Sequence, residues 1–156
     1  MSSIEGKMKE IMGVDLPPPS KPLGAYVPAQ KHGTQVFTAG QLPFKNGKLI
    51  ATGKVGKEVS EELAMECAKW CIFNCLNAAK SVIGDLSKVE KILKVNVFVN
   101  SAPGLTSQPK IANGASEFLV KVFGEAGKHA RAAVGVAELP MNSPVEIDMI
   151  LALKDV

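Results

Sequence analysis

The chain has 156 residues, of which 46% are hydrophobic and 21% charged, and its formal net charge is +3. This length and composition predict one globular domain with an ordinary core and exclude wholesale disorder. The basic residues are spread along the sequence, so no basic patch indicates nucleic-acid binding, and no apolar run is long enough to span a membrane.

The N-terminal region predicts a short helix followed by an extended segment. Residues 3–12 have the apolar spacing of an amphipathic helix, and the proline-rich residues 17–22 favour an extended connector. The chain starts without the apolar core of a secretory signal, and its three cysteines are an odd number for a disulfide framework. We therefore expect a protein of the reducing cytoplasm.

Strand patterns follow at 35–40 and 44–50, and Asn46-Gly47 within the second is a strong signal for a tight hairpin turn. Ser60 can cap a helix that starts with two glutamates and stops at Gly84. The side chains of this helix that we expect in the core are Leu63, Cys67, Trp70, Cys71, Cys75 and Val82. Those expected to face water are Glu62, Glu66, Lys69, Asn77 and Lys80.

The second half of the chain alternates strands and a helix. Alternating residues predict a strand at 89–99, the next helix runs over about 109–123, and two strands follow at 130–136 and 145–153. The order is β-β-α-β-α-β-β. Right-handed crossovers place both helices on one face of a mixed sheet, which is an α+β fold.

The other face of this sheet is then left uncovered. The residues expected on it are Glu146, Asp148, Ile150 and Ala152 of the last strand and Ile92, Lys94, Asn96 and Phe98 of the middle strand. Such a face is too apolar to be left in water and too polar for a core, so we interpret it as a subunit interface.

Few residue patterns indicate chemistry on their own. Cys67, Cys71 and Cys75 recur every four residues, but metal motifs use tighter spacing on loops, so we interpret them as core residues and expect no metal. His32 and His129 have no triad partner at a recognisable spacing and are interpreted as surface residues.

Arg131 is the single arginine in a chain rich in lysine. A planar guanidinium can hold a carboxylate or phosphate with two parallel hydrogen bonds, which an ammonium cannot do. Composition alone leaves equally open that Arg131 is an ordinary surface residue.

The sequence around Arg131 is more specific. Residues 130–140, ARAAVGVAELP, followed by VEID at 145–148, resemble the signature block of the YjgF/Rid family of reactive enamine/imine deaminases, a group also labelled endoribonuclease L-PSP or translation-inhibitor-like. Residues 24–27, GAYV, and 38–43, TAGQLP, resemble the two other motifs of that family. The resemblance implies that residues 1–21 are an N-terminal extension and that 22–156 form a single domain.

The resemblance also implies a chorismate-mutase-like fold, a homotrimer and a ligand cleft at each subunit interface. It assigns Arg131 to the substrate carboxylate and Glu146 to the hydrolytic water. The further substrate contacts that it implies are Tyr26 at the cleft mouth, Gly40, Asn113 and Ala133. The family often has serine at the position of Ala39 and cysteine at that of Ala133, so substrate fit is open and a redox-switched thiol is not expected.

The implied reaction is hydrolysis of 2-iminopropanoate or 2-iminobutanoate to a 2-keto acid and ammonia, with no metal or cofactor. The expected partners are a small 2-imino or 2-keto acid and further copies of the chain, without membrane or nucleic acid. Two alternatives stay open, a metal-independent endoribonuclease or translation inhibitor and a non-catalytic trimer that binds keto acids. Glu146 without its motif would be an ordinary exposed strand residue.

Overall fold

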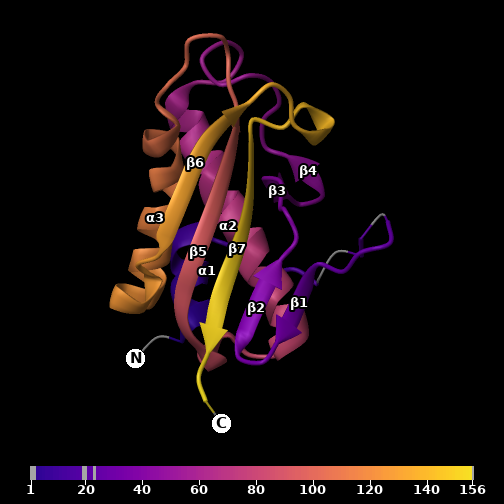
Figure 1. Cartoon of the computed structure of the whole chain (residues 1–156), viewed down its shortest axis with the longest axis vertical. Coiled ribbons are helices and arrows are strands. Elements are labelled where there is room, and N and C mark those ends of the chain that lie inside the picture. The colour runs from indigo at the N-terminus through magenta and orange to yellow at the C-terminus, as the bar shows by residue number, and fades with distance from the viewer. Residues whose placement is uncertain (1–2, 19–20, 23, 156) are drawn as a thin grey trace.

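The computed structural model describes residues 3–18, 21–22 and 24–155 and shows a five-stranded sheet backed by helices (Figure 1). Its strands are β1 (Ala29–His32), β2 (Gln35–Thr38), β5 (Val89–Asn100), β6 (Ala130–Val136) and β7 (Val145–Leu153). Across the sheet they lie in the order β1-β2-β7-β5-β6, with β5 and β6 parallel and the other neighbours antiparallel. The predicted α+β class and mixed sheet are confirmed.

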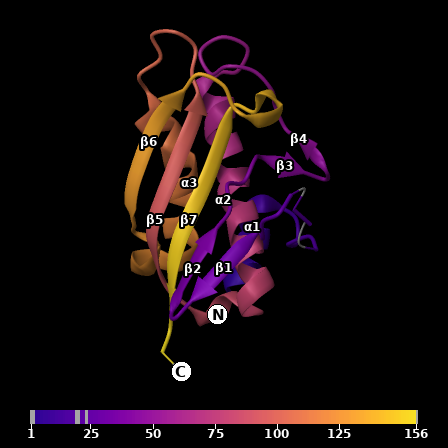
Figure 2. The ribbon, with the colours of Figure 1, turned by 45° about the vertical axis from the view of Figure 1, so that its right-hand side comes forward.

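The helices lie together on one side of the sheet in both views (Figures 1 and 2). They are α1 (Ile4–Met12), α2 (Glu61–Ile83) and α3 (Gln108–Phe123). Short 3₁₀ helices follow α2, α3 and β6, namely η1 (Leu86–Lys88), η2 (Gly124–Gly127) and η3 (Pro140–Asn142). α2 packs against both α3 and the central strand β7. No helix in the described part of the chain is both long and apolar enough to cross a membrane.

The segment predicted as a strand at 44–50 does not join the main sheet. It forms a separate hairpin of β3 (Phe44–Lys45) and β4 (Lys48–Leu49). The turn residues Asn46 and Gly47 have φ values of 53° and 78°, as the predicted tight turn requires. The strand that pairs with β2 at the edge of the sheet is β1 instead, and it was not predicted. Its one buried residue is followed by three exposed ones, so the segment lacks the alternating pattern of a strand.

Both predicted ends of α2 are confirmed. The Ser60 hydroxyl accepts a hydrogen bond from the Leu63 amide at 3.1 Å, and the helix stops at Gly84, which has a φ of 84°. The predicted one-sided core stripe is wrong in part. The sheet, α3 and the β3–β4 hairpin surround the middle of the helix, so Asn77 is only 8% exposed, whereas Leu63 and Val82 near the two ends are each 39% exposed.

The face of the sheet opposite the helices is uncovered in the described part of the chain, as predicted (Figure 2). Its half-buried residues include Glu146, Asp148 and Ile150 of β7. One prediction for this face is wrong, because a register shift between Ile92 and Lys94 turns Ile92 into the core. Ala152 lies on the uncovered face opposite the exposed Gln35 and Lys91, but its small side chain is only 9% exposed.

The N-terminal helix is confirmed, and it contributes to the core through Met8 and Met12. Ser3 caps it by accepting a hydrogen bond from the Gly6 amide at 2.9 Å. The predicted connector at 17–22 falls partly outside the described residues, and its described part has no helix or strand. The division of the chain at residue 21 stays a prediction.

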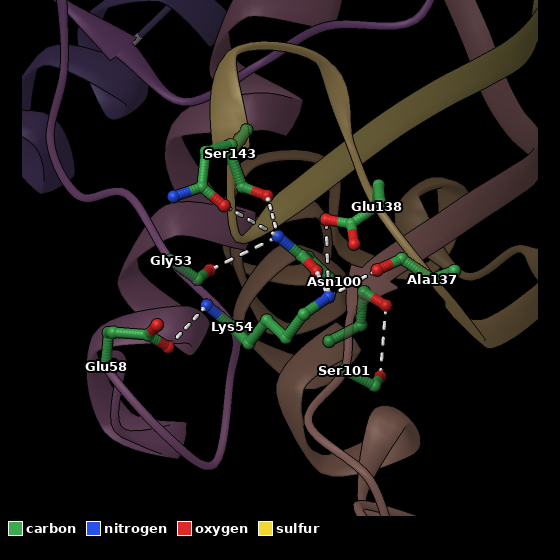
Figure 3. A network of polar contacts seen from close by, with 10 residues as sticks. Gly53, Lys54, Glu58, Asn100, Ser101, Ala137, Glu138 and Ser143 are labelled. Carbon is green, nitrogen blue, oxygen red and sulfur yellow. Dashed lines mark hydrogen bonds and ion pairs between the residues drawn. The ribbon is translucent and has the colours of Figure 1, made fainter.

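A buried polar network links three segments at the end of the sheet where β5 and β6 stop (Figure 3). The side-chain nitrogen of Asn100, a fully buried residue, donates to the Ser143 carbonyl at 3.1 Å, and its oxygen accepts from Lys54 Nζ at 2.9 Å. The same ammonium donates to the Ala137 carbonyl and lies 3.4 Å from the Glu138 carboxylate. The loop after β4, the end of β5 and the β6–β7 connection are thereby held in one arrangement.

Asn100→Ala is expected to lower the free energy of unfolding by about 2–4 kcal/mol, because it leaves buried polar groups without partners. Urea unfolding at a fixed protein concentration measures the change. Glu138→Ala is the matched control within the same network. The Glu138 side chain is 76% exposed, so its removal should cost no more than about 1 kcal/mol. Equal losses in the two variants would show that Asn100 does not hold the segments together.

Candidate functional site

A cavity of about 920 Å³ lies where the segment after β2, the β3–β4 hairpin and α2 meet. Tyr26, Gly40 and Glu146 line it, three of the residues predicted for substrate binding or catalysis. The proline-rich N-terminal segment and η3 contribute further parts of its wall. The structure therefore brings half of the predicted site residues to one concave surface.

Glu146 contributes a carboxylate to this cavity. It lies opposite Phe98 of β5 on the uncovered face of the sheet and is half-buried. Among the described residues its carboxylate has no hydrogen-bond partner. Burial raises the pKa of Glu146, and the neighbouring Asp148 carboxylate raises it further. A carboxyl group of this kind is suited to take a proton from a bound water and to give it back.

Gly40 lies directly against this carboxylate. The backbone of Gln41 pairs with Ile147, with hydrogen bonds of 2.7 and 3.1 Å, and this pairing holds the preceding Gly40 beside Glu146. A Cβ at Gly40 would collide with the Glu146 carboxylate. Glycine is thus required for the carboxylate to keep its position. Tyr26 lies at the rim of the cavity with 56% of its surface exposed.

The other three predicted residues gather around β6. Arg131 pairs with the buried Val95, so its side chain is on the side of the sheet that the helices cover. Its Nη1 donates to Asn113 Oδ1 at 2.8 Å and to Ser116 Oγ at 3.1 Å, both on α3. Nε and Nη2 have no partner among the described residues, so two N–H groups remain for a bidentate carboxylate. Ala133, two residues further along, packs against the core.

A single chain does not bring Arg131 and Glu146 together. The two residues lie on either side of β5, and their partners on that strand, Val95 and Phe98, are three residues apart. Their positions differ by roughly 10 Å along β5 and by roughly 10 Å across it. Their side chains also point to opposite faces of the sheet. A reaction that uses both groups therefore needs a second copy of the chain.

His129 is part of the support of Arg131, and its interpretation as a surface residue is wrong. Its Nδ1 lies 2.6 Å from the Gly127 carbonyl oxygen and its Nε2 lies 2.8 Å from Ser116 Oγ. With the proton on Nδ1, Nε2 accepts from the Ser116 hydroxyl while the hydroxyl oxygen accepts from Arg131. The spacing of Asn113 and Ser116, three residues apart on a predicted helix, is the signal that could have indicated this pair.

The three cysteines are core residues, as predicted. The thiols of Cys71 and Cys75 donate to the carbonyls of Val145 and Ile147 on β7, at 3.5 and 3.3 Å. Burial raises the pKa of Cys67 to about 12 and also raises the pKa values of the other two thiols. All three thus remain protonated and act as small apolar side chains. His32 is exposed, as predicted.

Similarity to known proteins agrees with this fold and these motifs. A model of the YjgF/chorismate mutase-like endoribonuclease family matches residues 7–153. The chain belongs to this family. The three motifs by which the YjgF family was expected from the sequence contribute Tyr26, Gly40 and Glu146 to the cavity and Arg131 and Ala133 to β6.

Relatives of known sequence or structure cover almost the whole chain. Protein TCP17 of Trypanosoma cruzi is 38% identical to it, over 92% of this chain and 91% of its own length. A 2-iminobutanoate/2-iminopropanoate deaminase of Dermatophagoides farinae is 29% identical, over 94% and 98% respectively. The crystal structure of Atu1372 from Agrobacterium tumefaciens, a protein of unknown function, has a TM-score of 0.90 and 43% identity and covers 97% of this chain and 92% of its own.

The two departures from the YjgF/Rid pattern fall in different places. Ala39 lines the cavity, so the missing hydroxyl changes the surface that a ligand would meet. Ala133 shares the β6 face with Arg131 and packs against the core. Neither departure removes the guanidinium of Arg131 or the carboxylate of Glu146.

Proposed function

We propose that this YjgF-family protein hydrolyses 2-imino acids to 2-keto acids and ammonia, in sites that two copies of the chain form together. One observation carries the proposal: Arg131 is held through a single nitrogen, with two N–H groups left for a carboxylate, while Glu146 presents an unpartnered carboxyl group in a cavity. The deaminase name of the Dermatophagoides farinae relative supports the same chemistry.

In the proposed reaction Arg131 binds the substrate carboxylate and places the imine carbon beside Glu146 of the neighbouring copy. Glu146 takes a proton from a water molecule, and the water oxygen bonds to the imine carbon. The proton passes to the nitrogen, giving a carbinolamine. The hydroxyl proton then passes to the nitrogen through Glu146 while the carbon–nitrogen bond breaks and the C=O bond forms, which releases ammonia and leaves the keto acid. One water is consumed for each ammonia formed.

The assembly that we propose is a homotrimer. Phe37 and Val134 on the uncovered face of the sheet are 40% and 45% exposed, which supports its use as an interface. Pairing two such faces about a two-fold axis would not reach Arg131, which is on the opposite side of the sheet. An interface that joins the Arg131 edge of one copy to the Glu146 face of the next is heterologous, which is the kind of interface that a homotrimeric ring uses.

Light scattering at micromolar concentration is expected to give a mass of about three times the 16.5 kDa of one chain. Charge placed on the interface tests which surface is used. Val134→Glu should shift the mass toward that of the monomer, and Val82→Glu, near the end of α2 at 39% exposure and away from the proposed interface, should leave it unchanged. A monomeric wild-type protein would contradict the assembly.

An assay that generates imines in situ tests the proposed activity. An amino-acid oxidase or dehydratase supplies the imine, semicarbazide traps what has not been hydrolysed, and added wild-type protein should reduce the trapped product. Arg131→Ala should lose this effect. RNA cleavage measured on the same two preparations tests the endoribonuclease label, and cleavage without imine hydrolysis would contradict the proposal.

The activity should depend on pH through Glu146. The carboxylate is the active form and its pKa is raised, so kcat/KM is expected to rise with pH around a midpoint above the usual range of a glutamate. Asp148→Asn removes a like charge and should move this midpoint to lower pH. Comparing variants on the same imine cancels the titration of the substrate. Glu125→Gln, whose side chain is 86% exposed, is the control and should leave the midpoint in place. An unmoved midpoint in Asp148→Asn would count against Glu146 as the titrating group.

A further inference from the structure

The cavity that begins at Glu146 continues well past the expected reacting groups. One side of α2 forms its inner wall, through Trp70, Phe73, Asn74, Asn77 and Ala78. These residues recur at intervals of three and four, so they follow one side of the helix over about 12 Å. A methyl or ethyl side chain on an imine bound at Glu146 would reach only the start of this wall.

Most of the residues of α2 that line the cavity are themselves almost fully buried. Trp70, Phe73 and Ala78 are 5%, 1% and 3% exposed. The rings of Trp70 and Phe73 meet edge to face with centroids 5.2 Å apart, and the Lys45 ammonium lies 5.2 Å from the centre of the Trp70 ring. Phe44 of the hairpin lines the same space. Aromatic walls of this kind favour a flat, apolar ligand group.

Asn77 places a polar group within this apolar lining. It is 8% exposed, and among the described residues its amide has no hydrogen-bond partner. Asn74, one turn earlier, is different, because its side-chain nitrogen donates to the carbonyls of Leu42 and Phe44 at 2.9 and 3.1 Å and so holds the hairpin. Asn77 is not among the described residues with a fully buried, unpartnered side-chain atom, so its amide is accessible from the cavity and can bind a ligand or a water.

The size of the cavity also favours a ligand larger than the two small imines. Sites of about 300–1,000 Å³ hold drug-sized ligands, and this cavity of about 920 Å³ is near the upper end of that range. Neither 2-iminopropanoate nor 2-iminobutanoate would fill it. Either of them would also leave the aromatic wall and Asn77 without contacts.

We infer that the site takes 2-imino acids with a large aromatic side chain, which extends from Glu146 along α2 and hydrogen-bonds to Asn77 through a polar group at its far end. The inference rests on the proposed function and narrows its substrate class. The substrate carboxylate remains with Arg131 of the second copy, so the side chain is the group that enters the part of the cavity along α2.

The first test compares substrates with the wild-type protein. An amino-acid oxidase generates the imines of tyrosine and phenylalanine, and a threonine dehydratase generates 2-iminobutanoate. The kcat/KM for the tyrosine-derived imine is expected to exceed that for 2-iminobutanoate by at least about tenfold. A smaller ratio would overturn the inference.

Variants of the inner wall then test the residues. Ala78→Leu fills part of the cavity and should reduce the ratio of kcat/KM for the tyrosine-derived imine to kcat/KM for 2-iminobutanoate by at least about tenfold. Val82→Leu, on the same helix but outside the cavity, is the control and should keep the wild-type ratio. Asn77→Leu nearly preserves volume and removes an unpaired amide, so it is expected to fold even if Ala78→Leu does not. It should reduce the preference for the tyrosine-derived over the phenylalanine-derived imine by about fivefold to tenfold. An unchanged preference would overturn the role of Asn77.

Failure of the inference can be told apart from failure of the proposed function. Hydrolysis of 2-iminobutanoate without a preference for aromatic imines would leave the function in place and overturn the inference. If no imine is hydrolysed, the proposed function is contradicted. Calorimetry with 4-hydroxyphenylpyruvate and pyruvate then tests whether the cavity prefers a ligand with an aromatic side chain. Tighter binding of 4-hydroxyphenylpyruvate that is lost in Ala78→Leu would support the aromatic pocket, and equal or absent binding would overturn it.

Discussion

Glu146→Gln is expected to slow imine hydrolysis by about 10²–10⁴-fold, the range usual for general acid–base catalysis. Glutamine keeps the shape of the side chain beside Gly40 but cannot take a proton from water. In the proposed mechanism Glu146 acts on the water, and Arg131 binds the carboxylate, which substrate and product share. Binding of the keto-acid product should therefore stay close to that of the wild type.

Two measurements on Glu146→Gln separate chemistry from binding. Single-turnover hydrolysis of an in situ imine reports the chemical step, and calorimetry with the keto acid reports binding, after circular dichroism has shown a native fold. Arg131→Lys provides the contrast, since it keeps the charge, loses the bidentate geometry and should weaken keto-acid binding by about 1.5–3 kcal/mol. Wild-type turnover in Glu146→Gln would mean that other groups position the water and that Glu146 is an ordinary strand residue.

Mixed trimers of Arg131→Ala and Glu146→Gln chains are expected to recover about one third of the wild-type activity, although each variant alone is nearly inactive. Each proposed site takes Arg131 from one copy and Glu146 from its neighbour. In a ring of three that contains both variants, about one interface in three joins an intact arginine to an intact glutamate, whichever variant is present twice. Co-expression of the two chains with different affinity tags, followed by two-step purification, provides the mixed species for the assay.

The control for this experiment pairs Arg131→Ala with a chain that carries both substitutions. No copy in that mixture has an intact Arg131, so no activity should return. Recovery in the first mixture alone would support a shared site, in agreement with the separation of the two residues across β5. Absence of recovery in mixed trimers of native mass would contradict it, because chains that each contained a complete site could not complement one another.

Much of the local structure could be predicted because it depends on neighbouring residues. Ser60 caps α2 with its own hydroxyl, Gly84 ends that helix, and Asn46-Gly47 makes the hairpin turn through positive φ angles. The strands β5 and β7 were predicted from their alternating side chains. β1 was not, since three of its four residues are exposed.

The site was predictable only as a set of residues. The motifs indicated Arg131 and Glu146, but no pattern along the chain shows that they lie on opposite faces of the sheet, because that depends on the order and register of β6, β5 and β7. The support of Arg131 by Ser116 and His129 likewise depends on α3 packing beside β6. Whether the residues meet in a trimer stays a proposal.

The sequence by itself determined the helix ends, the hairpin turn, the mixed sheet and the family, since caps, turns, periodicity and motifs are all properties of short segments. Only the tertiary structure decided which side chains of α2 are buried. Periodicity describes a helix covered on one side, whereas the sheet, α3 and the hairpin cover α2 on several sides. For that reason Asn77, which its place in the helical pattern assigns to water, is 8% exposed and lines the cavity.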